Sequence, residues 1–366
     1  MKKIIVSVTT DLISDQRVHK MCLSLHNAGN DVFLVGRKLN DDLVQARPYK
    51  FKRFNMFFKK GFFFYMFFNI KLFLFFLFKK CDVYISNDLD TLLANFLASK
   101  IKKKPLVYDS HELFTEVPEL TSKRFVKYFW LQIEKIFFPK LKHIITVSEG
   151  IASFYKEKYG KSILVVRNVP FLNKYSSMQE EYFNLLSFNK NQKNIIYQGS
   201  LNKDRGVFLM IDAMQYVNAN LFILGSGDLE EELKENVAQK GLNKKIFFVG
   251  RVPFQKLKNI TKRFDLGLSF EEDTCLAYRF SLPNKIFDYV HAEIPVLASD
   301  LPDISKFINK NNIGEVLSSR FPQKVASQIT EMLSRKDFYI DYLKKAKIEY
   351  CWEQEEKKII NLFNHL

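Results

Sequence analysis

Cysteine is scarce in this 366-residue chain, and its four cysteines lie far apart, at Cys22, Cys81, Cys275 and Cys351. They show no Cys-x-x-Cys spacing, which argues against a disulfide framework and against a cysteine zinc site. Other metal-ligating side chains are not clustered either, so we expect no metal and no resident cofactor. The apolar run near Met1 is too short for a signal peptide. These absences together predict a protein of the reducing cytoplasm.

Acidic side chains are scarce in the first half of the chain. Residues 1–170 contain 29 Lys and Arg against 15 Asp and Glu, whereas residues 171–366 contain 27 against 25. A basic half of this kind suits nucleic acid or an anionic membrane surface. The basic residues accompany phenylalanine-rich runs and do not alternate with single aromatic residues as in a nucleic-acid groove. We therefore expect an anionic membrane surface as partner and no nucleic acid.

The phenylalanine-rich stretch at residues 51–80 is the most unusual part of the sequence. Residues 61–78 are almost wholly apolar and predict a helix of roughly 27 Å, near the lower limit for crossing a bilayer. Lysines bracket both ends, and a core strand follows with no second span to bring the chain back, so we reject a crossing. Two alternatives stay open: a helix packed on the sheet, or a helix at about 57–80 that docks into the membrane interface.

Short apolar runs alternate with helical patterns along the whole chain. Strands are predicted at 3–8, 31–36, 82–86, 105–108, 143–147 and 163–166, and again at 194–198, 221–224, 246–249, 266–270 and 294–298. This alternation predicts an α/β protein with two Rossmann-like domains. The polar stretch 171–192 marks the junction, which gives domains at 1–170 and 171–350. The tail at 351–366 is predicted to cross back to the first domain.

Residues 264–303 combine two predicted strands with a helix between them. Pro283 suits the first turn of that helix and Ser281 suits its N-cap. A helix N-terminus attracts anions, and Lys285 adds a positive charge beside it. Asp288, one turn further on, can accept hydrogen bonds from vicinal hydroxyls. A cation for a phosphate and a carboxylate for a ribose together indicate a nucleotide site, although an ordinary capped helix with a solvated lysine explains the spacing equally well.

The sequence Ser-Leu-Pro-Asn-Lys-Ile-Phe-Asp-Tyr at 281–289, followed by Ile-Pro-Val-Leu-Ala-Ser, resembles the donor-binding segment of the family 4, or group 1, glycosyltransferases. The resemblance implies the GT-B fold, with two Rossmann-like domains facing across a cleft. It also implies retaining transfer from a nucleotide sugar without a metal. The family often has two glutamates separated by seven residues. Asp288 stands at the second of these positions and Phe280 at the first, so Glu271 or Glu272 would contact the sugar hydroxyls instead.

The same resemblance assigns the donor site in the second half. Gly199–Gly206 is a glycine-flanked basic turn after a strand, and Arg205 with Lys285 would stabilise the leaving diphosphate, with Lys203 in reserve. Gly225 and Gly227 form the family's Gly-x-Gly turn beneath the nucleotide. Arg251 falls in the stretch that lines the base, and Asn284 precedes Lys285 at the helix start.

In the first half, Asp109-Ser110-His111-Glu112 follows a predicted strand and resembles the family's Asp-x-His-Glu/Asp loop. The resemblance implies that His111 lies beside the transferred sugar at the cleft, with Asp109 and Glu112 on the acceptor side. Asp15 and Arg17 stand near the position where the family often has a glycine pair. Arg17 could substitute as a cation or as an acceptor contact, although a surface salt bridge explains it at least as well.

The acceptor is expected to be a glycan or a lipid-linked precursor of a surface polysaccharide. The enzyme would then act in the cytoplasm, peripherally at the inner face of the cell membrane. One alternative stays open, because the sequence departs from the family pattern at three points. The first glutamate and the glycine pair are missing, and Ser200 replaces a basic residue that is usual in the family. That alternative is a non-catalytic, membrane-associated scaffold with the GT-B fold.

Overall fold

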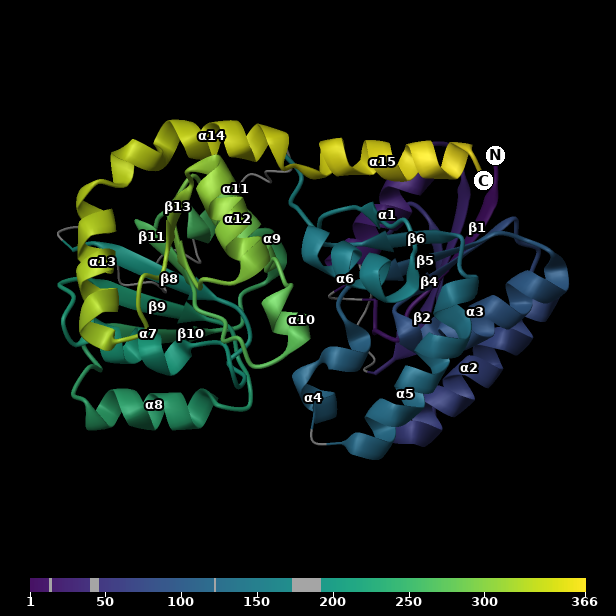
Figure 1. The fold of residues 1–366 in the computed structure, drawn as a ribbon, viewed down its shortest axis with the longest axis horizontal. Helices are drawn as coiled ribbons and strands as arrows, with labels where there is room; N and C mark the ends of the chain where they lie inside the picture. Colours follow the sequence, from purple (N-terminus) through teal and green to yellow (C-terminus); the bar gives the residue numbers. More distant parts are fainter. Residues whose placement is uncertain (13–14, 40–45, 122, 173–191) are drawn as a thin grey trace. The chain divides into compact units, whose positions relative to one another are not determined.

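The chain forms two compact units (Figure 1). The computed structural model describes residues 1–12, 15–39, 46–121, 123–172 and 192–366. Unit 1 comprises Met1–Asn168 and Gln354–Leu366, and unit 2 comprises Val169–Glu353. The predicted domain boundaries were 170 and 350, and most of the predicted junction at 171–192 lies outside the described residues.

Unit 1 is built on a seven-stranded parallel sheet with the order β3-β2-β1-β4-β5-β6-β7. The strands are β1 (Lys3–Ser7), β2 (Asp31–Lys38), β3 (Lys50–Asn55), β4 (Val83–Asn87), β5 (Leu106–Ser110), β6 (His143–Thr146) and β7 (Leu164–Val165). The central strands β4 and β5 are buried at every residue, as expected for parallel strands covered on both faces. The sequence analysis missed β3, because it lies within the phenylalanine-rich stretch and was assigned to it.

The helices of unit 1 connect these strands. They are α1 (Gln16–Asn27), α2 (Gly61–Phe78), α3 (Leu89–Lys102), α4 (Pro118–Thr121), α5 (Arg124–Phe137) and α6 (Glu149–Tyr159). The chain moves from β1 toward β3 in one direction and from β4 toward β7 in the other. Right-handed crossovers therefore place the helices of the two halves on opposite faces, and the order reverses between β1 and β4.

Unit 2 repeats this design with a six-stranded parallel sheet in the order β10-β9-β8-β11-β12-β13. Its strands are β8 (Asn194–Gln198), β9 (Asn220–Leu224), β10 (Ile246–Gly250), β11 (Leu266–Ser269), β12 (Val296–Ala298) and β13 (Gly314–Val316). Its helices are α7 (Val207–Met214), α8 (Glu230–Gln239), α9 (Phe254–Thr261), α10 (Leu276–Arg279), α11 (Asn284–Ala292), α12 (Pro302–Asn311), α13 (Pro322–Ser334) and α14 (Ile340–Glu349). Here the order reverses between β8 and β11. The expectation of two Rossmann-like domains is confirmed.

The last helix, α15 (Trp352–Asn364), belongs mainly to unit 1. It packs near α1, where Ser24 Oγ donates a hydrogen bond of 2.5 Å to Glu356. Glu355 accepts hydrogen bonds from the backbone N–H of Arg167 and from Lys358. The side chain of Trp352 is fully buried at the start of the helix.

The start of α11 differs from the prediction. Pro283 is the N-cap and not a first-turn residue, and the helix begins at Asn284. Ser281 does not cap the helix, because its hydroxyl donates to the carbonyl of Tyr278 at 2.8 Å. Further along the chain, a short 3-10 turn (Lys336–Tyr339) leads directly into α14.

Helix α2 packs one narrow stripe against unit 1 and exposes the rest. Phe64, Phe68, Leu72 and Phe76 follow a four-residue spacing and are buried. Asn69, the polar residue in the middle of the helix, donates to the carbonyl of Asp90 at 2.8 Å and accepts from the N–H of Ala94. In the part of the chain that the structure describes, α2 is the one helix long and apolar enough to cross a membrane by length and composition.

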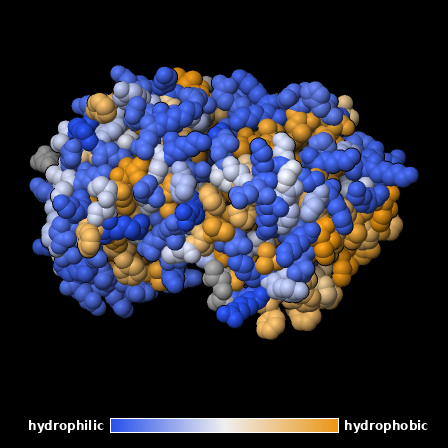
Figure 2. Space-filling view, viewed as in Figure 1, coloured by the Kyte–Doolittle hydropathy of each residue, from blue (hydrophilic) through white to orange (hydrophobic). Residues whose placement is uncertain are grey.

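The exposed residues of α2 and α5 form a continuous apolar area on unit 1, visible as the orange region at the lower right of Figure 2. We call it the apolar surface. The large apolar side chains exposed there are Phe62, Phe63, Phe67, Ile70, Leu74, Phe78, Phe125, Val126, Tyr128, Phe129 and Ile136. The two helices meet through the rings of Phe62 and Phe129, whose centroids are 5.7 Å apart. Of the two alternatives for this stretch, packing on the sheet accounts for the buried face of α2. It does not account for the exposed apolar face.

Candidate functional site

Both sheets place their predicted site residues at the carboxyl ends of their strands, at or near the point where the strand order reverses. In open parallel α/β sheets, ligands bind at this edge, because the loops on either side of the reversal diverge and leave a crevice. In unit 2 the loops after β8 and β11 meet there, and in unit 1 the loops after β1 and β4 do so.

In unit 2, Lys285 and Glu271 form a buried ion pair. Lys285 lies in the first turn of α11, and its Nζ is 2.7 Å from Oε1 of Glu271. Glu271, two residues beyond the end of β11, is 0% exposed and accepts a second hydrogen bond of 2.7 Å from Ser269 Oγ. Burial alone would raise the pKa of Glu271, but Lys285 and the hydrogen bonds outweigh it and hold the pKa below its usual value. Glu271 is therefore a carboxylate.

Arg205 brings a second cation to the same carboxylate. Its Nη1 lies 3.8 Å from Oε1 of Glu271, and its guanidinium stacks 4.7 Å from the ring centre of Tyr278. Lys285 similarly faces the ring of Tyr197 at 4.3 Å. Aromatic faces attract cations, so each ring stabilises a charge at this edge. The predicted phosphate pair, Arg205 and Lys285, is thus brought together at one point, with Tyr197 and Tyr278 as supports that the sequence analysis did not identify.

Two glycines make this close packing possible. A Cβ at Gly225 would lie 1.8 Å from the carbonyl oxygen of Gly199, and a Cβ at Gly206 would lie 2.1 Å from that of Phe270. Both glycines have positive φ, which L-residues with side chains rarely adopt. The loops after β8, β9 and β11 therefore touch through their backbones. Gly227 packs in the same way against Leu201 and Asn202.

The other predicted donor residues lie around this cluster. Asp288 accepts a hydrogen bond of 2.7 Å from Nε2 of Gln198, the last residue of β8. Asn284 is exposed at the first position of α11, and Lys203 is exposed in the loop before α7. Arg251 is also exposed, and its Nε contacts the hydroxyl of Ser226.

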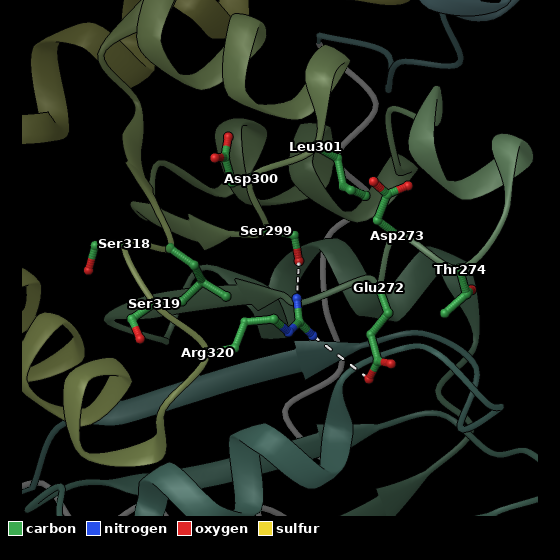
Figure 3. A pocket seen from close by; sticks show the side chains of 10 residues that line it. Glu272, Asp273, Thr274, Ser299, Asp300, Leu301, Ser318, Ser319 and Arg320 are labelled. Atoms are coloured by element: carbon green, nitrogen blue, oxygen red, sulfur yellow. Dashed lines mark hydrogen bonds and ion pairs between the residues drawn. The ribbon is translucent and has the colours of Figure 1, made fainter.

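A pocket of about 500 Å³ lies beside this cluster, at the carboxyl ends of β11, β12 and β13 (Figure 3). Ser, Thr and carboxylate side chains line it; they include Glu272, Asp273, Thr274, Ser299, Asp300, Ser318 and Ser319. Arg320 points into it, 3.8 Å from Glu272 and 3.4 Å from Ser299 Oγ, and its Nη2 donates to the carbonyl of Phe270 at 3.0 Å. Glu272 faces this pocket whereas Glu271 is buried. This difference corrects the expectation that either one could contact a sugar.

In unit 1, Arg17 and Asp109 form a second buried ion pair. The guanidinium donates two hydrogen bonds to the carboxylate, of 3.0 and 2.7 Å, and a third of 2.8 Å to the carbonyl of Val166. Although burial opposes it, Arg17 and His111 hold the pKa of Asp109 far below its usual value. Arg17 is buried, and the three hydrogen bonds that it donates stay inside unit 1. Its burial corrects the expectation that Arg17 contacts the acceptor.

His111 lies between two carboxylates. Its Nε2 is 3.2 Å from both Asp109 Oδ2 and Asn87 Oδ1, and its Nδ1 is 3.3 Å from Asp88 Oδ2. Burial alone would lower the pKa of His111, but Asp88 and Asp109 raise it to about 9. Because both ring nitrogens face acceptors, His111 is an imidazolium at neutral pH. It is a cation and hydrogen-bond donor there, not a general base.

Asp88, which the sequence analysis treated only as part of a helix start, fixes the position of His111. Its Oδ1 accepts a 2.8 Å hydrogen bond from the N–H of His111. Asp88 has a φ of 55°, a strained conformation for a residue with a side chain. Strain of this kind is common at functional sites. The sequence feature that could have identified Asp88 is its position as a carboxylate directly after a central strand.

The remaining acceptor-side residues have different surroundings. Asp15 is the N-cap of α1 and accepts from the N–H of Val18 and from Thr10 Oγ1. Glu112 is exposed in the loop after β5. Within the described ranges no group of three or more His, Cys, Asp or Glu side chains could hold a metal ion. The expected independence from metal stays a prediction.

Comparison with known proteins matches both halves of the chain. Residues 15–169 match the model of Glycosyltransferase Family 4, and residues 178–349 match the model of Glycosyl transferases group 1. Uncharacterized glycosyltransferase MJ1069 of Methanocaldococcus jannaschii is 24% identical over 294 residues, which cover 76% of this chain and 72% of that protein.

Solved structures show the same fold. Sucrose-phosphate synthase of Thermosynechococcus elongatus superposes with a TM-score of 0.83 at 13% identity, covering 100% of this chain and 99% of that one. Anabaena HepE in complex with UDP and glucose has a TM-score of 0.76 at 13% identity, and the whole of both chains is covered.

Proposed function

The chain belongs to the family 4, group 1 glycosyltransferases, which are nucleotide-sugar-dependent enzymes, and we propose that it transfers its sugar with retention of configuration. The donor is a nucleoside diphosphate sugar held by unit 2. The observation that carries this proposal is the convergence of Lys285 and Arg205 at the edge where β8 and β11 meet. A diphosphate accepts hydrogen bonds from both cations and from the N-terminus of α11.

In the proposed reaction the bond between the anomeric carbon and the diphosphate oxygen breaks while an acceptor oxygen bonds to that carbon. The leaving diphosphate takes the proton of the acceptor hydroxyl. Lys285 and Arg205 stabilise the charge that develops on the diphosphate. We propose that His111 contributes its positive charge near the anomeric carbon, while its two ring nitrogens stay bonded to Asp88 and Asp109.

We further propose that the transferred sugar occupies the pocket in Figure 3, with Glu272 accepting hydrogen bonds from its hydroxyls. The pocket has the size of a small-molecule site and its lining suits a polyol. Its carboxylates outnumber its one guanidinium, which favours a neutral sugar over an anionic one. Because HepE binds UDP and glucose, a UDP-hexose is the first donor to test.

The apolar surface of unit 1 supports action at a membrane. Exposed phenylalanines lie on α2 and α5, with Lys59 and Lys60 before α2 and Lys79 and Lys80 after it. Aromatic side chains enter the interface and lysines attract anionic headgroups. We propose a lipid-linked glycan precursor as acceptor and a peripheral position at the cytoplasmic face of the membrane.

Thermal stabilisation by a panel of nucleoside diphosphates tests the donor site. A diphosphate at 100 times its dissociation constant stabilises by about 2.7 kcal/mol. We expect a shift for one base that is strongly reduced in Arg205→Ala. Release of that diphosphate from its sugar in the presence of an acceptor then tests catalysis. Binding without any turnover would favour the non-catalytic scaffold, and no shift with any nucleotide would contradict the proposal.

A further inference from the structure

Glu271 occupies the position where the proposed function places the charge of a diphosphate. Its Oε1 is 2.7 Å from the ammonium of Lys285 and 3.8 Å from the guanidinium of Arg205. These are the two cations expected to hold the leaving group. A carboxylate oxygen and a phosphate oxygen are similar acceptors for such donors. Glu271 therefore makes the contacts that a phosphate would make.

From this geometry we infer that Glu271 is an internal counter-ion that competes with the donor diphosphate for Lys285 and so promotes release of the nucleoside diphosphate product. The inference rests on the proposed function, because it assumes that the diphosphate binds at Lys285 and Arg205. It assigns Glu271 a positioning role: the carboxylate acts through Lys285 and does not touch the sugar.

Burial makes this competition strong. Glu271 is fully buried, and Lys285 is only 8% exposed, so water screens little of their interaction. Removing the partner of a buried charge is strongly unfavourable. The pair therefore stabilises the site and holds the lysine in place. A diphosphate that enters this site gains both cations but meets the negative charge of Glu271.

Glu271 does not satisfy all the hydrogen-bond donors of the two cations, as Arg205 shows. Its Nε is buried and has no hydrogen-bond partner among the described residues. The cluster carries two cations and one carboxylate, and this excess positive charge attracts an anion. Gly199 leaves room beside the lysine: a Cβ there would lie 3.3 Å from Nζ.

Anchoring by Ser269 keeps Glu271 in the competing position. The hydroxyl of Ser269 donates to Oε2 at 2.7 Å, which leaves Oε1 toward the two cations. When the product leaves, Glu271 can form its ion pair with Lys285 again without moving. Glu271 is the one ion-pair partner of both cations in the part of the chain that the structure describes, so without this carboxylate the diphosphate becomes their strong counter-ion.

Glu271→Gln tests the inference, because glutamine keeps the shape but loses the charge. We expect the free variant to melt at a lower temperature, since Lys285 loses its counter-ion. We expect it to bind the nucleoside diphosphate about tenfold more tightly, which calorimetry measures directly. In steady-state kinetics, kcat and the KM for the donor should both fall, as product release becomes slower. A purely structural role for Glu271 predicts the lower melting temperature alone.

Glu271→Asp provides a graded second variant if the glutamine variant does not fold. The aspartate side chain is shorter by one methylene, so its carboxylate reaches Lys285 less well. The affinity of this variant for the nucleoside diphosphate should therefore lie between those of the wild type and Glu271→Gln. The matched control is Asp265→Asn at the opposite end of β11, where the carboxylate is 3.1 Å from Lys336. That change can destabilise unit 2 but should leave diphosphate affinity unchanged.

These measurements distinguish a wrong role for Glu271 from a wrong donor site. Equal or weaker diphosphate binding by both Glu271 variants would overturn the inference while leaving the glycosyltransferase function intact. If the wild type and all variants fail to bind any nucleoside diphosphate, the proposed donor site itself is wrong.

Discussion

The ammonium of Lys285 and the carboxylate of Glu271 form an ion pair of 2.7 Å at the edge where β8 and β11 meet. The two residues are 14 positions apart in sequence and belong to a helix N-terminus and a strand end. Such a pair places a strong cation, already oriented, at the position in a parallel α/β sheet where ligands bind.

Arg205→Ala should lower the turnover number by about 10²–10³-fold, the usual cost of removing one donor to a developing charge. Arg205 is partly exposed and lies 3.8 Å from Glu271, so its loss should change the melting temperature little. Steady-state kinetics with the nucleotide sugar measure the effect. Lys234→Ala, an exposed cation on α8 outside the site, is the control, and a similar loss there would argue that Arg205 has no special role.

Glu272→Gln should raise the KM for the nucleotide sugar about tenfold, because a hydrogen bond to a charged group contributes about 1.5–3 kcal/mol. The affinity for the free nucleoside diphosphate should stay unchanged, since Glu272 lies in the pocket beside Arg320 and not at Lys285. Comparing the two ligands by calorimetry separates the sugar contact from the diphosphate contact. Equal weakening of both would show that the sugar does not occupy this pocket.

Arg17→Ala should lower the free energy of unfolding of unit 1 by about 3–5 kcal/mol, because it leaves Asp109 buried without its main counter-ion. Chemical denaturation followed by hydrogen exchange in unit 1 measures the change. The control is Lys104→Ala, which breaks the exposed pair with Asp82 and should cost about 0–1 kcal/mol. Comparable effects of the two changes would contradict a special role for the buried pair.

His111 should make the stability of unit 1 fall at alkaline pH. Its pKa is raised from 6.5 to about 9 in the folded protein. The stabilisation from its charged form is therefore fully present below about pH 6.5 and is lost as the pH rises through about 9. Melting temperatures of the wild type and His111→Gln should converge across this range. A gap between them that stays constant from pH 6 to pH 10 would mean that His111 is not charged.

The double variant Phe62→Ser, Phe63→Ser should bind anionic vesicles about tenfold more weakly or worse, because it removes two apolar rings that would enter the membrane interface. Both side chains are about half exposed, so the fold should persist. Vesicle flotation in low and high salt measures binding, and salt should weaken it only for anionic lipids. Phe321→Ser, an exposed phenylalanine of unit 2, is the control. Unchanged binding of the double variant would exclude the apolar surface as the contact.

The apolar runs at 3–8, 82–86, 194–198 and 266–270 were sufficient to predict buried parallel strands, because strands covered on both faces need continuous apolar sequence. Their alternation with helices determined the fold class. The motif around Lys285 identified the family, and the spacing of Arg205 and Gly206 after a strand identified its basic loop. β3 escaped prediction because its sequence is basic and aromatic and continues into the phenylalanine-rich helix.

Tertiary structure alone decided which charged residues face each other. Nothing in the sequence distinguishes Glu271 from Glu272, yet one is buried against Lys285 and the other lines a pocket with Arg320. Arg17 looked like a surface cation until the fold placed Asp109, 92 residues away, against its guanidinium. Local sequence determines strands and helix starts through periodicity and capping. The partner of a charge depends on which strand ends become neighbours, and only the order of the strands in the sheet determines that.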